Sequence, residues 1–159
     1  MTDLTRPAAH DLVLVSAVQP ALLDLVALSL HGTGAVTVSA AVLGEAELDT
    51  GTDTGTDADD EPGRGVLVRL SALDDEDPSG TAVLDVRVAT RCWTCAVREA
   101  LLSLALERAA LEPDGVTVVL LPPGIELVHL VPGLADAVRR EPSLRLAGVA
   151  HAVDVDAAA

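Results

Sequence analysis

Asp11-Leu-Val-Leu-Val-Ser-Ala-Val18 is a short apolar run rich in Val and Leu, and the chain turns at Pro20 into a second apolar segment. The spacing of the leucines and valines between 22 and 30 suits a buried helix, which we expect to end near Gly32. β-Branched and apolar residues resume over 35–43. The opening stretch therefore predicts one β-α-β unit with a right-handed crossover.

Strand and helix patterns alternate again later in the chain. Segments 65–73 and 81–89 predict two strands of a hairpin, joined by an acidic turn at 74–80. Beyond the hairpin we expect a helix at 95–111, a strand at 115–121, a helix at 125–140 and a last strand at 144–155. Pro132 should kink the second of these helices or split it in two. The whole predicts one α/β domain over 1–159, a mainly parallel sheet flanked by helices.

The segment 44–65 differs in composition from its surroundings. It is rich in Gly, Thr, Asp and Glu and contains the near-repeats Thr50-Gly-Thr-Asp53 and Thr54-Gly-Thr-Asp57. Such a segment buries too little apolar surface to offset the entropy of ordering. We therefore predict a disordered acidic insertion at 44–65. Its carboxylates at 57–61 lack the spacing and the Gly of a calcium loop.

The charge of the chain limits its partners. Twenty-five acidic residues face ten Arg and no Lys, which gives a formal net charge of −15. This balance argues against a surface that follows nucleic-acid phosphates. No signal-peptide pattern opens the sequence, and no apolar run reaches the roughly 20 residues that span a bilayer. We expect a cytoplasmic protein without membrane association, in which two cysteines favour metal, redox or packing roles over a structural disulfide.

Arg91-Cys-Trp-Thr-Cys95 lies between a predicted strand and a predicted helix, where α/β folds place functional loops. Two Cys three residues apart at the start of a helix direct both sulfurs to one side and can chelate one soft ion such as zinc. The helix N-terminus also favours the thiolate that metals require. Cys92 and Cys95 are therefore the predicted metal ligands.

One C-x-x-C pair supplies only half of a tetrahedral zinc site, so several alternatives stay open. A homodimer would bring four cysteines together, and the candidates for a third ligand within one chain are His10, His31, His129 and His151. The same pair could instead form a redox dithiol, because strand, C-x-x-C and helix follow one another as in thioredoxin-like proteins. A protein-interaction scaffold without small-molecule chemistry is the third alternative.

The stretch Cys92-Trp-Thr-Cys-Ala-Val-Arg-Glu-Ala-Leu101, with the following helix, strand and closing Val153-Asp154, resembles CobW-type metallochaperone GTPases, relatives of UreG and HypB. In that family a Cys-x-Cys-Cys motif before a helix binds metal, commonly zinc or cobalt, and GTP is coupled to metal transfer. Cys92 and Cys95 match the first and last thiols, and Thr94 replaces the middle one. The resemblance implies a P-loop-NTPase-like fold, a role in zinc homeostasis, and a metal-donating or metal-receiving partner protein.

The nucleotide-binding residues of that family are missing. A P-loop needs G-x-x-x-x-G-K-[ST], whereas residues 16–23 contain no Gly, Lys or Thr. After the later strand, Leu121-Pro-Pro-Gly124 keeps only the Gly of the family pattern. The guanine-reading Asn-Lys-x-Asp motif and the C-terminal domain of the family would follow residue 159. We therefore expect a degenerate, truncated member without catalytic residues, which has lost GTP hydrolysis and does not depend on GTP or magnesium.

Overall fold

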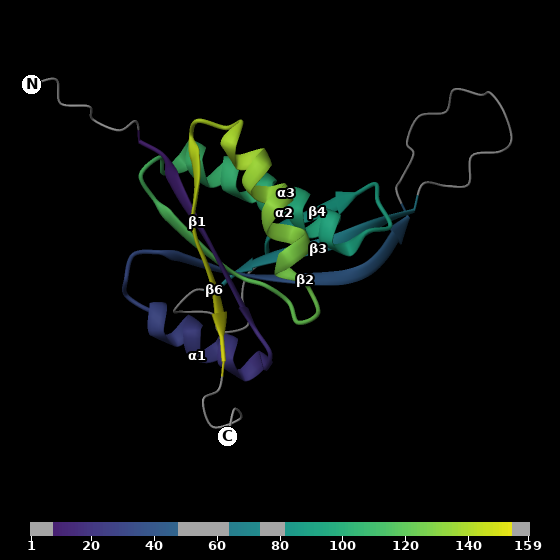
Figure 1. The fold of residues 1–159 in the computed structure, drawn as a ribbon, viewed down its shortest axis with the longest axis horizontal. Coiled ribbons are helices and arrows are strands. Elements are labelled where there is room, and N and C mark those ends of the chain that lie inside the picture. The colour runs from purple at the N-terminus through teal and green to yellow at the C-terminus, as the bar shows by residue number, and fades with distance from the viewer. Residues whose placement is uncertain (1–7, 48–63, 74–81, 154–159) are drawn as a thin grey trace, which may run out of the picture.

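The computed structural model of the chain describes residues 8–47, 64–73 and 82–153 (Figure 1). Six strands and three helices are found in these ranges. In chain order they are β1 (His10–Ala17), α1 (Pro20–Leu30), β2 (Val36–Glu47), β3 (Arg64–Ala72), β4 (Ala82–Val88), α2 (Trp93–Leu111), β5 (Val116–Leu120), α3 (Leu127–Arg139) and β6 (Leu144–Ala152).

The strands form one mixed sheet in the order β4-β3-β2-β5-β1-β6. β1 pairs in parallel with β5 and β6, and β2 pairs in parallel with β5. β3 is antiparallel to both of its neighbours, β2 and β4. The predicted α/β class, the mainly parallel sheet and the antiparallel pairing of the third and fourth strands are confirmed, and the predicted acidic turn at 74–80 lies outside the described residues. All strands except β3 therefore end at the same edge of the sheet.

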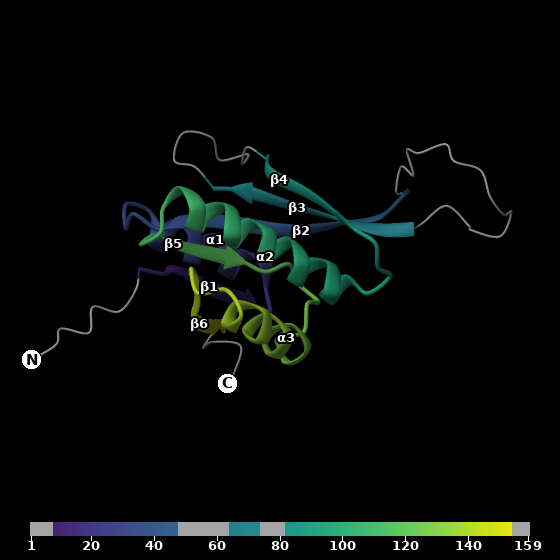
Figure 2. The ribbon, with the colours of Figure 1, turned by 90° about the horizontal axis from the view of Figure 1, so that it is seen from above.

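Helices cover both faces of the sheet (Figure 2). α2 and α3 lie on one face, where a large apolar cluster joins them to all six strands. α1 lies on the other face and packs over the ends of β1 and β5, where Leu23 contacts the smaller cluster around Val15 and Leu120. The larger core is built from Leu, Val and Ala, as the lack of Phe and Tyr requires.

α2 is the central helix of the larger core. Leu101 and Leu104 are fully buried, and small alanines at 96, 100 and 105 let the helix lie close to the sheet. α3 approaches α2 at Gly133, where a Cβ would lie 3.0 Å from Nη1 of Arg98. The start of α2 is thus held by packing on two sides.

The first four residues of the predicted acidic insertion are not disordered. β2 continues to Glu47 and pairs with β3, which begins at Arg64, so the prediction is wrong for 44–47 and for 64–65. The backbone hydrogen bonds to β3 hold this polar segment, and Gly44 accommodates a register shift with φ of 114°. The remaining predicted insertion at 48–63, including the acidic residues 57–61, lies outside the described residues.

Two helix predictions also need correction. α3 is one helix from Leu127 to Arg139 with Pro132 inside it, so of the two predicted outcomes, a kink or a split, the split is wrong. Pro132 removes only the hydrogen bond to the carbonyl of Val128, a residue in the exposed first turn. α2 begins at Trp93, two residues earlier than predicted, because Cys92 serves as its N-cap. No helix in the described ranges has the length and apolarity needed to cross a membrane.

Candidate functional site

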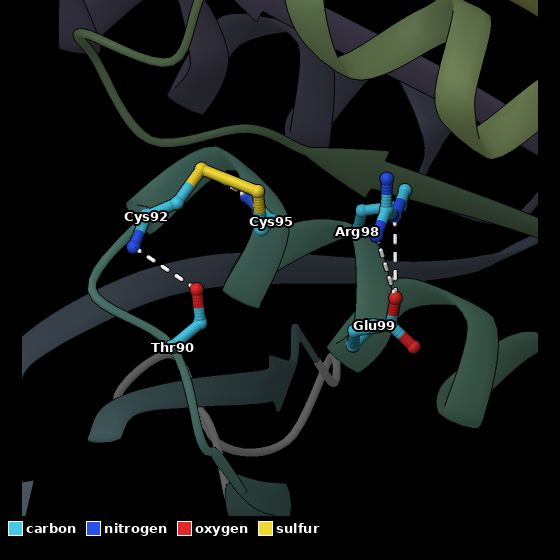
Figure 3. The surroundings of a disulfide bond; sticks show 5 residues. All are labelled: Thr90, Cys92, Cys95, Arg98 and Glu99. Atoms are coloured by element: carbon cyan, nitrogen blue, oxygen red, sulfur yellow. Dashed lines mark hydrogen bonds and ion pairs between the residues drawn. A yellow bond between two sulfur atoms is a disulfide. The ribbon is translucent and has the colours of Figure 1, made fainter. Parts of the chain in front are cut away.

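Cys92 and Cys95 lie together at the start of α2, after the carboxyl end of β4. Their Cα atoms are 5.2 Å apart and their sulfurs are joined in a disulfide (Figure 3). Cys92 is the N-cap residue, and its Sγ accepts a hydrogen bond from the backbone N–H of Cys95 at 3.2 Å. The backbone N–H of Cys92 donates to Oγ1 of Thr90 at 3.1 Å. The local turn and the helix start therefore bring both sulfurs to one side.

This disulfide ties no distant elements together. It spans three residues of sequence, within a turn that the Ala96 N–H to Cys92 carbonyl bond of 3.0 Å already closes. From the sequence we expected metal, redox or packing roles for the two cysteines rather than a structural disulfide. The structure contains a disulfide, but a bridge of this span constrains little of the unfolded chain. The bridge does hold the two sulfurs close together at the start of a helix whose opposite face is buried in the core.

The pair lies at an exposed helix start, and several Arg are close to it in sequence. Arg91, Cys92 and Trp93 are exposed, with Trp93 at 54%, and Cys95 is half-buried. From Asp85 to Glu99 the chain carries three Arg and two acidic residues, although its overall charge is −15. Asp85 pairs with Arg69 and Glu99 with Arg98. Positive charge and a helix N-terminus both favour the thiolate form of cysteine.

The pair supplies two of the four ligands of a tetrahedral zinc site. Across the described residues, no group of three or more His, Cys, Asp or Glu side chains is placed to hold a metal ion. Two adjacent thiols on one turn fit bidentate binding of a single soft ion, whose other positions would be open to another molecule. The pair alone therefore does not form a closed structural zinc site in the described part of the chain.

None of the four histidines joins the cysteines. His10 is fully buried and bonded through both ring nitrogens to Glu112 and Thr117. His31 caps the end of α1, and His129 pairs with Glu126 at 2.9 Å. The fourth histidine, at 151, lies on β6. The predicted third ligands within one chain are thus not brought to the cysteines in the described part of the chain.

A second polar feature at the same sheet edge was not found from the sequence. A cavity of about 410 Å³ lies at the carboxyl ends of β1, β5 and β6 and is lined by Pro122, Pro123 and Glu126, among others. Inside it, Oγ of Ser16 lies 2.7 Å from Nδ1 of His151. These two residues face each other because they are register partners on β1 and β6, a relationship that only the strand order reveals.

The connection from β1 to α1 is very short. Only Val18 and Gln19 separate Ala17 from Pro20, and Gln19 caps the helix without a side-chain hydrogen bond. A phosphate-wrapping loop has no room here, and neither residue is Gly. Comparisons with known proteins add no assignment, since no protein-family model, curated protein or solved structure matches the chain.

Proposed function

We propose that this chain is a degenerate CobW-like protein of zinc homeostasis, in which Cys92 and Cys95 bind the metal and GTP hydrolysis has been lost. The observation that carries the proposal is the pair of adjacent, accessible sulfurs at the start of α2. A cytoplasmic location and a partner protein that donates or receives the metal belong to the same proposal. A homodimer that shares one ion between two pairs is compatible with it.

The order of the strands supports a P-loop-NTPase-like arrangement. β1 lies inside the sheet with parallel neighbours on both sides. After β1 the chain crosses β5 to reach β2 on one side, whereas after β5 it crosses β1 to reach β6 on the other side. This reversal is a topological switch point, beyond which open α/β sheets place their ligands. The cysteine pair follows β4, which ends at that same edge of the sheet but is separated from β5 by β3 and β2.

The loss of GTP chemistry is supported by the two-residue turn after β1. Phosphoryl transfer by P-loop enzymes depends on backbone amides that surround the phosphates, a Lys and a magnesium-binding hydroxyl. Val18 and Gln19 provide none of these groups, and the whole chain lacks Lys. Glu126 adds a carboxylate to the neighbouring cavity, which disfavours a polyphosphate.

In this proposal zinc is a cargo held by two thiolates. The N–H of Cys95 stabilises charge on the sulfur of Cys92, and the positions that the pair leaves vacant accept ligands from a partner protein. Transfer then proceeds by stepwise ligand exchange, since an ion with two protein ligands is released more easily than one enclosed by four. The packing of α2 in the core holds the two cysteines in the same geometry while zinc passes from one partner protein to another.

The test is a zinc titration of the reduced protein in competition with a chromophoric chelator. We expect one ion per cysteine pair, loss of binding in Cys92→Ser/Cys95→Ser, and no effect of GTP with magnesium. Thr94→Cys should tighten binding, because it restores the middle thiol of the family motif. Equal zinc binding by the wild type and the double variant would remove the basis of the proposal.

A further inference from the structure

Disulfide formation and zinc binding exclude each other at this site. When two thiolates bind one tetrahedral zinc with Zn–S distances near 2.3 Å, their sulfurs lie about 3.8 Å apart. A disulfide holds its sulfurs at about 2.05 Å and leaves neither as a thiolate. The described residues include no other cysteine. Oxidation of Cys92 and Cys95 therefore removes both protein ligands at once.

The two sulfurs are not equivalent. Cys92 is exposed and lies before the first turn of α2, whereas Cys95 is half-buried within that turn. The N–H of Cys95 points at the sulfur of Cys92 and favours its thiolate form. A disulfide arriving from solution thus meets Cys92 first, and Cys95 is placed to react second.

The charge of Arg91, next to the pair in sequence, favours one kind of disulfide. Arg91 is exposed and directly precedes Cys92, whereas Arg87, four residues earlier, interacts with Asp85. Arg98 forms an ion pair with Glu99, with 2.9 Å between Nη2 and Oε1. Local positive charge raises the encounter rate of small anions even on a protein that is acidic overall. The exposed ring of Trp93 adds an apolar surface beside the sulfurs.

We infer that the pair reacts with small anionic disulfides and that this thiol–disulfide exchange releases the bound zinc, an inference that rests on the proposed function. The Cys92 thiolate attacks one sulfur of R–S–S–R, which forms a mixed disulfide and expels one R–S⁻. The Cys95 thiolate then attacks Sγ of Cys92, which closes the intramolecular bond and expels the second R–S⁻. The small disulfide is reduced by two electrons, the cysteine pair is oxidised, and Zn²⁺ leaves.

The first experiment follows zinc release from the reduced, zinc-loaded chain. Glutathione disulfide is the anionic probe and cystamine the cationic one, with released zinc read by a chromophoric chelator and the protein disulfide by mass spectrometry. We expect complete zinc release with closure of the disulfide, and rebinding after reduction with a phosphine. Zinc that stays bound in excess glutathione disulfide would overturn the inference and leave the proposed function intact. A reduced chain that binds no zinc before any oxidant is added overturns both.

The second experiment tests which sulfur reacts first and whether local charge determines which disulfide reacts faster. In metal-free reduced Cys95→Ser, glutathione disulfide should leave a stable mixed disulfide on Cys92, and Cys92→Ser should react much more slowly. A faster adduct on Cys95 would contradict the assigned order. Arg91→Gln should slow the reaction with glutathione disulfide by roughly three- to tenfold, and this difference should disappear at high salt. The same substitution should not slow the reaction with cystamine. An equal effect on both probes would refute the selection by charge.

Discussion

Nε2 of His10 lies 2.8 Å from Oγ1 of Thr117, and both side chains are fully buried. Nδ1 of the same ring lies 2.7 Å from the carbonyl oxygen of Glu112. A carbonyl only accepts hydrogen bonds, so Nδ1 carries a proton, and in the neutral ring Nε2 accepts from the Thr117 hydroxyl. This one imidazole joins the start of β1 to β5 and to the end of α2, and it serves structure where the sequence had offered a metal ligand.

Thr117→Val keeps the shape of the side chain and removes the donor to His10. The buried Nε2 is then an acceptor without a partner, and we expect a loss of about 1–3 kcal/mol in the free energy of unfolding. Urea denaturation measures it. Thr33→Val is the control for an exposed hydrogen bond: Oγ1 of Thr33 donates to the Leu30 carbonyl at 2.7 Å, and because water can replace this bond, its loss should cost less. Equal effects of the two substitutions would show that burial adds nothing to the His10 contact.

The periodicity of the sequence predicted most helices and strands because each depends on local patterns of burial. It could not predict that β5 lies between β1 and β2, since the apolar run Val116–Leu120 is compatible with any buried position in the sheet. Nor could it predict that β2 continues through polar residues to Glu47, because cross-strand backbone bonds hold that part of the strand.

The same distinction applies to the candidate site. Cys92 and Cys95 were predicted as a pair because their proximity follows from a spacing of three residues at a helix start. Ser16 and His151 are separated by 135 positions in sequence and meet only through the pairing of β1 with β6. Contacts that depend on strand order were therefore missed, and contacts within one turn were found.

Leu104→Ala tests the role of α2 as the central helix of the core. Leu104 is fully buried in the larger apolar cluster, and we expect its truncation to cost about 2–5 kcal/mol of unfolding free energy. Leu106→Ala, two residues along the same helix at a 38% exposed position, should cost much less. Denaturant unfolding of both variants provides the comparison. A cost at Leu106 equal to that at Leu104 would contradict the assigned face of α2.

Arg69 and Asp85 form a bidentate ion pair across β3 and β4, with N–O distances of 2.8 and 2.7 Å. The hydrogen bonds from Arg69 lower the pKa of Asp85 below its ordinary value of 3.8. The folded state therefore gains stability from this pair above the unfolded pKa and loses it as the pH falls through the folded pKa. Both side chains are about two-fifths exposed, so solvent screening keeps this contribution small.

Arg69→Gln should raise the pKa of Asp85 toward its ordinary value. NMR titration of the Asp85 carboxyl carbon reads this change directly, without relying on global stability. Arg139→Gln removes an exposed Arg that pairs with Asp136 instead, and it should leave the Asp85 titration unchanged. An Asp85 titration that is insensitive to the loss of Arg69 would mean that the pair does not persist in solution.

Reduction of the Cys92–Cys95 disulfide should lower the free energy of unfolding by no more than about 2 kcal/mol, because so short a loop constrains the unfolded chain little. The fold should therefore survive reduction, which a site that alternates between thiols and disulfide requires. Urea unfolding with and without a phosphine reductant, followed by the fluorescence of Trp93, the single Trp, measures the difference. Cys92→Ser/Cys95→Ser is the control, and its free energy of unfolding should not change with reductant. Unfolding of the wild type on reduction alone would identify the bond as structural and rule out reversible use of the pair.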